Sequence, residues 1–271
     1  KEGQSQNYLE ENANWRLDYQ WTNTATYKTK FNEDHDVTFM IGTEAMKFGV
    51  GRSMKAIRYD YIFENNPNTW ILNNGSSDNM KNEGKMFDKS TMFGLFFRGD
   101  YSYKGKYLAT VTVRRDASSR FGEDNRWGTF PSLSLGWRMS DEVFMEKTRT
   151  WLDDLKVRAG YGTTGNSNIG NRAISYYQTG NNNEFGGTES IGVYLSQMGN
   201  PDLKWETTTE WNVGLDLGFF NNRLNVTAEY FRKVVSDLLA ERSLLTFNEA
   251  DKIAANIGKT QSQGFELTIN T

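Results

Sequence analysis

Residues 210–219 alternate between apolar and polar side chains along the whole segment, which reads EWNVGLDLGF. The apolar set is Trp211, Val213, Leu215, Leu217 and Phe219, and the polar set is Glu210, Asn212, Gly214, Asp216 and Gly218. Successive side chains of a β-strand point to opposite faces of the sheet, so the two sets lie on opposite faces. The segment therefore predicts a strand with one apolar face and one polar face.

The same alternation recurs in about nine segments of the chain. They lie at residues 15–21, 36–41, 93–101, 107–114, 132–138, 155–161, 209–219, 223–230 and 265–270. Repeated two-faced segments with aromatic ends are typical of transmembrane β-barrels, where one face contacts lipid and the other contacts water. The pattern predicts an all-β fold: part of an antiparallel transmembrane β-barrel, with about nine strands forming an open, curved sheet.

The connections between these segments alternate in length. Short turns are expected at residues 32–36, 104–106 and 221–222, and long connections at residues 48–89, 115–129, 163–207 and 236–262. Outer-membrane barrels have short periplasmic turns and long extracellular loops, so this alternation favours a barrel. Residues 140–154 break the rhythm, and their apolar spacing behind Ser140 predicts either a short helix at the periplasmic rim or an irregular turn.

The composition is consistent with this fold. The chain has 271 residues, no cysteine, 3 prolines and a mean hydropathy of −0.70. Few prolines suit a protein made of paired strands, because proline cannot donate to the hydrogen-bond ladder. The net charge of −3 and the lack of a basic, aromatic-rich run argue against nucleic acid as a partner. The absence of cysteine excludes disulfides and thiolate metal sites.

Charged side chains on the polar faces of the predicted strands are candidates for lining a water-filled lumen. They are Arg98, Asp100, Arg138, Arg158, Glu210, Asp216, Glu229 and Glu266. Aromatic side chains near the short turns are expected at one level, at the periplasmic membrane interface. These are Tyr101, Tyr103, Tyr107, Phe219 and Phe220, whereas Trp205 and Trp211 are expected toward the opposite rim.

Three blocks of sequence carry a family resemblance. They are RRDASSRFGEDNRWGTFPSLSLGWR at 114–138, WLDDLKVRAGYGTTGN at 151–166, and GNPDLKWE at 199–206 with the strands that follow it. Their order and spacing resemble the barrel of SusC/RagA-type TonB-dependent outer-membrane transporters. Residues 1–105 fit as earlier barrel strands but contain no comparable block.

The resemblance implies a barrel of about 22 strands, closed by a plug, that lies in the bacterial outer membrane and imports nutrients with energy from TonB. It implies oligosaccharide or peptide cargo, a SusD-like surface lipoprotein, the TonB complex and the lipid bilayer as partners, and no enzymatic activity. Residues 1–271 are expected to be part of the barrel domain, without a plug domain or a signal peptide.

Within the first block, Arg115, Asp116, Ser118, Ser119, Arg120 and Phe121 form the motif that most resembles the family. We expect this motif in an extracellular loop. It has two interpretations: it lines the external mouth, or it orders the loop through Arg–Asp pairing and serine–backbone hydrogen bonds.

Other motifs do not predict catalysis or cofactor binding. Residues 160–165 match GxGxxG, but that fingerprint requires a helix directly afterwards, and Asn- and Gly-rich sequence follows here. His35 is the only histidine, and one histidine cannot build a histidine-rich metal site. The carboxylate pairs Asp153–Asp154 and Glu123–Asp124 are adjacent in sequence, as in solvated turns. No catalytic residue, cofactor or metal site is therefore expected.

Two other classes of protein remain as alternatives. A soluble β-sandwich that binds carbohydrate would bury its apolar faces against each other in a core. A glycan-acting enzyme would require two carboxyl groups facing each other across a cleft.

Overall fold

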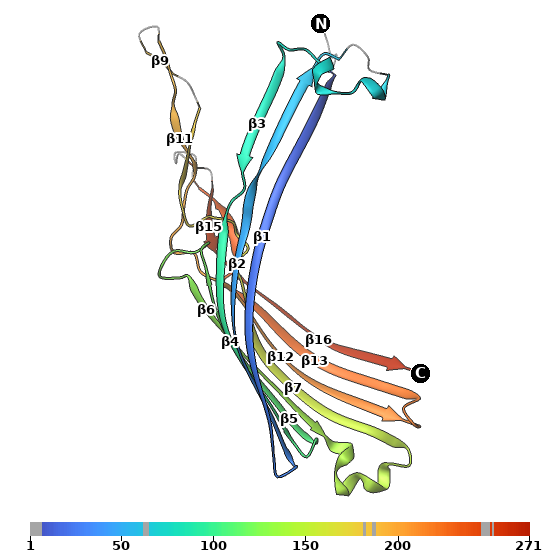
Figure 1. The fold of residues 1–271 in the computed structure, drawn as a ribbon. Helices are drawn as coiled ribbons and strands as arrows, with labels where there is room; N and C mark the ends of the chain where they lie inside the picture. The colour runs from blue at the N-terminus through green and yellow to red at the C-terminus, as the bar shows by residue number, and fades with distance from the viewer. Residues whose placement is uncertain (1–6, 62–64, 181–182, 186–187, 245–249, 251) are drawn as a thin grey trace. The chain divides into compact units, whose positions relative to one another are not determined.

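The computed structural model describes residues 7–61, 65–180, 183–185, 188–244, 250 and 252–271. The chain forms two compact units, each described by itself. The first comprises residues 1–20 and 46–90, and the second comprises residues 21–45 and 91–271. Strands dominate both units (Figure 1).

One antiparallel sheet contains the main strands in the order β1-β2-β4-β5-β6-β7-β12-β13-β16, with β3 paired to β2. Their bounds are β1 Tyr8–Phe31, β2 His35–Tyr59, β3 Met80–Met86, β4 Ser90–Tyr103, β5 Tyr107–Ser118, β6 Trp127–Arg138, β7 Leu152–Asn166, β12 Glu206–Phe219, β13 Leu224–Ser236 and β16 Lys259–Asn270. The main strands of the second unit curve together in a single, open layer (Figure 1). The predicted open antiparallel sheet is confirmed.

The register of the second unit separates the two faces as the alternation predicts. Leu215 of β12 lies opposite Val157 of β7 and Ala228 of β13. The apolar side chains of this face are exposed: Leu133 is 40% exposed, Val213 48% and Leu267 56%. Exposed apolar side chains on neighbouring strands form a continuous hydrophobic surface and not the core of a sandwich.

Several connections contain more structure than expected. Strand β2 continues to Tyr59, and β3 lies inside the predicted connection 48–89, which also holds the short 3₁₀ helices η1 Pro67–Thr69 and η2 Leu72–Asn74. The long connections after β7 and β13 contain short hairpin strands. These are β8 Tyr176–Thr179, β9 Asn183–Phe185, β10 Thr188–Ser190, β11 Val193–Gln197, β14 Leu239–Ser243 and β15 Lys252–Asn256. Strands of three to five residues are too short to show a clear alternation of apolar and polar side chains, so the sequence pattern does not predict them.

Residues 140–154 do not form one continuous helix. Two short 3₁₀ helices, η3 Met139–Asp141 and η4 Val143–Thr148, precede β7, and Ser140 lies inside η3 and does not cap a helix. The segment therefore falls between the two predicted conformations. Among the described residues, no helix combines the length and the apolar character needed to cross a membrane.

The short connections of the second unit gather at one end of its sheet, called here the turn end. The Lys104 amide donates to the Asp34 carbonyl at 2.6 Å, and the Arg138 amide donates to the Lys106 carbonyl at 2.8 Å. The β12–β13 turn uses positive φ at Phe220, Asn221 and Asn222. Asparagine adopts this conformation more easily than most residues. The opposite end, which carries the longer connections, is called the loop end.

The first unit contains parts of β1 and β2 together with β3. Lys55 Nζ contacts Glu10 Oε2 at 2.7 Å, and the Gly49 amide donates to Asp18 Oδ1 at 2.8 Å. Gly51 has φ +153°, and a Cβ there would lie 1.8 Å from the Trp15 carbonyl oxygen. Glycine is therefore required at this close approach of two strands.

Candidate functional site: the polar face and loop end of the sheet

The polar face of the second unit carries the charged side chains that alternation selected. Arg158 lies opposite Gly214, Glu229 lies opposite both Gly214 and Glu266, and Asp216 lies opposite Thr227. By the same alternation, one face carries Arg98, Asp100, Arg138, Arg158, Glu210, Asp216, Glu229 and Glu266. These side chains are spread along six strands and do not converge on one point.

Arg158 is the centre of the largest polar cluster on this face. Its Nε lies 3.1 Å from Asp216 Oδ2, and its Nη2 lies 2.6 Å from Glu229 Oε2. Thr227 Oγ1 donates to Asp216 Oδ1 at 3.1 Å, and Asn212 Nδ2 donates to Glu229 Oε1 at 2.7 Å. Hydrogen bonds and ion pairs thus connect β7, β12 and β13 across the polar face.

Glycines leave room for this cluster. A Cβ at Gly214 would lie 2.8 Å from Arg158 Cζ, and a Cβ at Gly160 would lie 2.2 Å from Asn212 Oδ1. Both glycines sit directly opposite the side chains that they accommodate. At these two positions glycine therefore leaves room for the side chains of Arg158 and Asn212 to lie over the neighbouring strand.

A second cluster surrounds Arg114, which the alternation places on the polar face but which is not among the predicted lumen-lining candidates. Arg114 Nε lies 2.8 Å from Asp116 Oδ2, and its Nη2 contacts Glu44 Oε2 of β2. The Phe96 ring lies beneath the guanidinium, 5.6 Å from its Cζ. The pairing partner Glu44 is 70 residues away in sequence, so only the assembled sheet identifies it.

Two smaller pairs complete the charged contacts of the predicted candidates. Arg98 Nη2 lies 2.9 Å from Asp100 Oδ1, which also accepts a hydrogen bond from Thr110 Oγ1 at 2.8 Å. Arg138 Nε lies 3.4 Å from Asp141 Oδ2 at the turn end. Both ion pairs remain partly exposed to solvent.

The motif at residues 115–121 lies only partly in a loop. Strand β5 runs to Ser118, so Arg115, Asp116 and Ser118 are strand residues, and the loop begins at Ser119. Arg115 and Asp116 point to opposite faces and do not pair: Asp116 pairs with Arg114, while Arg115 stacks over Trp127 at 5.0 Å. The expected Arg–Asp pair within the motif thus involves Arg114 in place of Arg115.

Serine–backbone bonds do order the rest of the motif. Ser119 Oγ accepts from the Thr91 amide at 2.8 Å, and Arg120 Nη1 donates to the Ser167 carbonyl at 3.1 Å. These bonds tie the loop to the start of β4 and to the segment after β7. They support the ordering role of the motif.

A buried hydrophobic cluster, called here the loop-end cluster, comprises Phe121, Phe130, Leu203, Trp205 and Ala254. Trp205 contacts Phe121 and Phe130 with ring centroids 5.3 Å apart in each case, and Trp205 Nε1 donates to the Arg126 carbonyl at 3.0 Å. Trp205 is therefore a core residue and not part of an exposed aromatic band. The cluster joins three connections that are far apart in sequence.

The position of Phe130 in the alternation is a sequence feature that could have predicted this cluster. Phe130 is an apolar residue at a position that alternation assigns to the polar face. Gly128 and Gly165 lie against its ring, since a Cβ at either would be 2.0–2.5 Å from Phe130 Cζ. Phe96 shows the same exception: a Cβ at Gly42 would lie 2.2 Å from its Cζ. An aromatic residue that interrupts the alternation thus packs its ring over glycine.

Aromatic side chains gather at the turn end as predicted. Tyr103 and Tyr107 stack with centroids 6.1 Å apart, and Tyr107 stacks on Trp137 at the same separation. Phe219 stacks on Trp151 and contacts Phe220. The two turns lie at the same end of the sheet, as expected from the strand order.

Glu142 is held among these rings. It accepts hydrogen bonds from the Tyr107 hydroxyl at 2.7 Å and Trp137 Nε1 at 3.2 Å, and Lys106 Nζ lies 3.2 Å away. These donors, Tyr107 first, hold the pKa of Glu142 below its ordinary value.

Two of the motifs that do not predict catalysis or cofactor binding lie within a strand and at a strand end. Residues 160–165 lie within β7 and are followed by strand and loop residues, so the GxGxxG match lacks its helix. His35 begins β2, with Nδ1 2.8 Å from the Tyr101 hydroxyl. Among the described residues, no group of three or more His, Cys, Asp and Glu side chains is arranged to hold a metal ion.

Sequence comparisons assign the chain to a family of barrels. The model of "TonB dependent receptor-like, beta-barrel" matches residues 2–271. The TonB-dependent receptor P39 of Formosa agariphila is 36% identical over 96% of this chain and 24% of its own length. The TonB-dependent receptor SusC of Bacteroides thetaiotaomicron is 41% identical over 67% of this chain and 18% of its own length.

Structural comparison agrees with the sequence match. A chain of the RagAB peptide transporter superposes with a TM-score of 0.82 at 28% identity, covering 96% of this chain and 28% of that chain. The present chain thus spans 18–28% of the length of these relatives.

Proposed function

Because this chain belongs to the TonB-dependent receptor-like β-barrel family, we propose that it forms part of the wall of an outer-membrane transporter that imports nutrients. The barrels of this family reside in the outer membrane. In this proposal the apolar face contacts lipid and the polar face borders the aqueous lumen. The wall supplies hydrogen-bonding groups along the path of the cargo and performs no chemical step.

The separation of the two faces carries this proposal. Exposed Val213 and Leu267 on one face would be unfavourable in water as part of a continuous apolar surface. On the other face, Arg158, Asp216 and Glu229 form ion pairs that remain partly accessible, with 20–32% of each side chain exposed. A sheet of this kind is stable where hydrocarbon covers one face and water reaches the other.

The relatives support a proposal for the cargo and the partners. SusC is 41% identical to this chain over the matched region, and the superposed RagAB structure is described as a peptide transporter. We therefore propose an oligosaccharide or a peptide as cargo, a SusD-like lipoprotein at the loop end, and coupling to the TonB complex through parts of the protein beyond this chain.

Membrane fractionation tests the placement. The full-length protein is expected in the outer-membrane fraction, to be extracted only by detergent, and to show heat-modifiable electrophoretic mobility. Recovery in aqueous buffer without detergent would instead support the soluble carbohydrate-binding alternative.

Uptake of labelled maltooligosaccharides and oligopeptides tests the function in cells that contain or lack the transporter. Import that requires both the transporter and TonB supports the proposal. Compared with the wild type, the Arg158→Gln variant should alter the rate of uptake while the amount of folded protein in the outer membrane stays the same. Import at the wild-type rate without the transporter would contradict the proposed function.

A further inference from the structure

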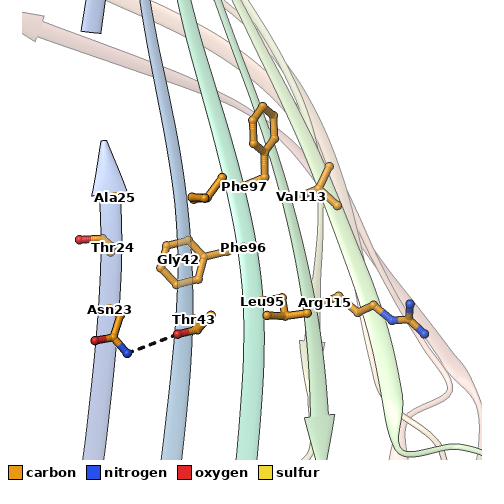
Figure 2. A pocket seen from close by; sticks show the side chains of 11 residues that line it. Asn23, Thr24, Ala25, Gly42, Thr43, Leu95, Phe96, Phe97, Val113 and Arg115 are labelled. Carbon is orange, nitrogen blue, oxygen red and sulfur yellow. Dashed lines mark hydrogen bonds between the residues drawn. The ribbon is translucent and has the colours of Figure 1, made fainter. Parts of the chain in front are cut away.

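A groove opens on the sheet of the second unit between β1, β2, β4 and β5. Its volume is about 580 Å³, and its apolar lining includes Ile41, Leu95, Phe97 and Val113. Figure 2 shows these strands side by side, with Phe97 and Val113 toward one end of the groove and Leu95 and Arg115 toward the other. None of the described residues that line the groove is acidic.

Arg115 is unusual among the arginines of this sheet because it shares the face of the apolar side chains. In the β4–β5 register it lies opposite Leu95, on the same face as the Phe97–Val113 pair two residues along. Its guanidinium stacks over Trp127 at 5.0 Å, and within the described part of the chain no carboxylate pairs with it. Its neighbour Arg114, on the polar face, is paired with two carboxylates.

The position of Arg115 along the strand also places it near one interface of the membrane. It is eight residues along β5 from Tyr107 at the turn end. A tilted strand advances roughly 2.5 Å per residue along the membrane normal, so Arg115 lies about 20 Å from the aromatic residues of the turn end. The apolar band of an outer-membrane barrel is about 25 Å tall, which places Arg115 near the outer interface. Trp127 and Phe93, in edge-to-face contact at 6.4 Å, mark the same level.

We propose that this groove binds a membrane lipid whose headgroup carries a phosphate, with an acyl chain along the apolar lining and the phosphate on Arg115. This inference rests on the proposed function, because it requires the apolar face to contact the membrane. An acyl chain matches the aliphatic and aromatic lining, and a guanidinium binds phosphate through paired, charge-assisted hydrogen bonds. A phosphate at the outer interface supplies the counter-charge that Arg115 lacks on this face.

Native mass spectrometry of the detergent-purified full-length transporter tests the site, with phosphatidylglycerol as the probe and phosphatidylcholine as the comparison. We expect the wild type to retain phosphatidylglycerol preferentially. Arg115→Gln should weaken this retention about tenfold, the loss expected for one charge-assisted contact. Arg138→Gln removes an arginine that is paired with Asp141 on the polar face and serves as the matched control.

A second variant tests the groove independently of the charge. Ile41→Trp would fill part of the groove while leaving Arg115 in place, and it should also weaken retention. Equal retention of phosphatidylglycerol by the wild type and by both variants would overturn the proposal. Full displacement of the lipid by inorganic phosphate would also overturn it, because the site would then recognise the phosphate alone.

The two proposals fail in distinguishable ways. A protein that enters the outer membrane and imports cargo but shows no preference for phosphatidylglycerol contradicts only the lipid site. A protein that is soluble without detergent contradicts both the proposed function and the lipid site.

Discussion

Neighbouring residues of β12 have opposite surroundings. Leu215 lies between the apolar residues Val157 and Ala228, whereas Asp216 is within hydrogen-bonding distance of Arg158 and Thr227. A one-residue shift along a strand exchanges the two faces, so adjacent substitutions compare the apolar face with the polar face at the same place in the strand.

Leu215→Arg in the full-length transporter should destabilise the barrel by about 2–4 kcal/mol, the cost of a cation on the lipid face near the midplane. Asp216→Asn should cost about 0.2–1 kcal/mol, because the pair is partly exposed and Arg158 keeps Glu229. The urea dependence of folding into lipid vesicles measures both values. A larger loss at Asp216 than at Leu215 would mean that the charged face is the one buried in lipid.

Glycines on the polar face are expected to differ sharply in tolerance. Gly160→Ala would place a Cβ 2.2 Å from Asn212 Oδ1 and disrupt the Asn212–Glu229 hydrogen bond. We expect a loss of about 1 kcal/mol in the free energy of unfolding. Gly136→Ala is the matched control, since the nearest atoms would lie 3.5 Å away, and it should be neutral or slightly stabilising. Equal losses at both sites would contradict the assigned packing.

At the scale of elements, each end of the sheet is held differently. The turn end is closed by stacked aromatic rings and by Glu142, which connects η3 and η4 to β5 and β6. The loop end is closed by the loop-end cluster, which brings three connections together. Strands of a single layer have no opposing sheet, so large side chains are buried mainly in the loop-end cluster, whereas Tyr107 and Trp151 at the turn end stay 44% and 48% exposed.

Protonation of Glu142 should loosen the turn end. Its folded-state pKa is lowered, so its contribution to stability is complete above the ordinary value of 4.5 and is lost as the pH falls through the folded-state value. The amide protection factors of residues 139–151, obtained by dividing the intrinsic exchange rate at each pH by the observed rate, should therefore fall below about pH 4.5. Glu142→Gln should remove this pH dependence. An unchanged pH profile in that variant would show that another group is responsible.

At the scale of the whole molecule, the sheet ends at β16, which pairs with β13 along one of its edges. Among the described residues, no strand pairs with the other edge of β16. Unpaired backbone groups are costly in lipid, so in the proposed barrel another strand must cover this edge.

The outward-pointing amides of β16 should therefore exchange with solvent faster in the isolated chain than in the full-length transporter. We expect a difference of about two- to tenfold, since one backbone hydrogen bond contributes about 0.5–1.5 kcal/mol. Amide exchange of both proteins in detergent micelles measures it, and the inward-pointing amides that bond to β13 are the internal control. Equal protection of both sets in the isolated chain would mean that β16 is not an edge strand.

The sequence by itself determined the two faces of each strand, because alternation with period 2 is a local property of each segment. It therefore predicted eight of the charged residues on the polar face, and, with the alternating lengths of the connections, the short turns at one end and the open antiparallel sheet. The resemblance in residues 114–138, 151–166 and 199–206 predicted the family.

Only the tertiary structure decided which polar groups pair and where burial occurs. Arg114 finds Glu44 at a separation of 70 residues, and Trp205 Nε1 finds the Arg126 carbonyl at a separation of 79. Alternation assigns a side chain to a face but gives no information about its neighbours across the sheet. Those neighbours depend on the register of each strand pair and on the paths of the long connections, which are set by contacts between segments distant in sequence.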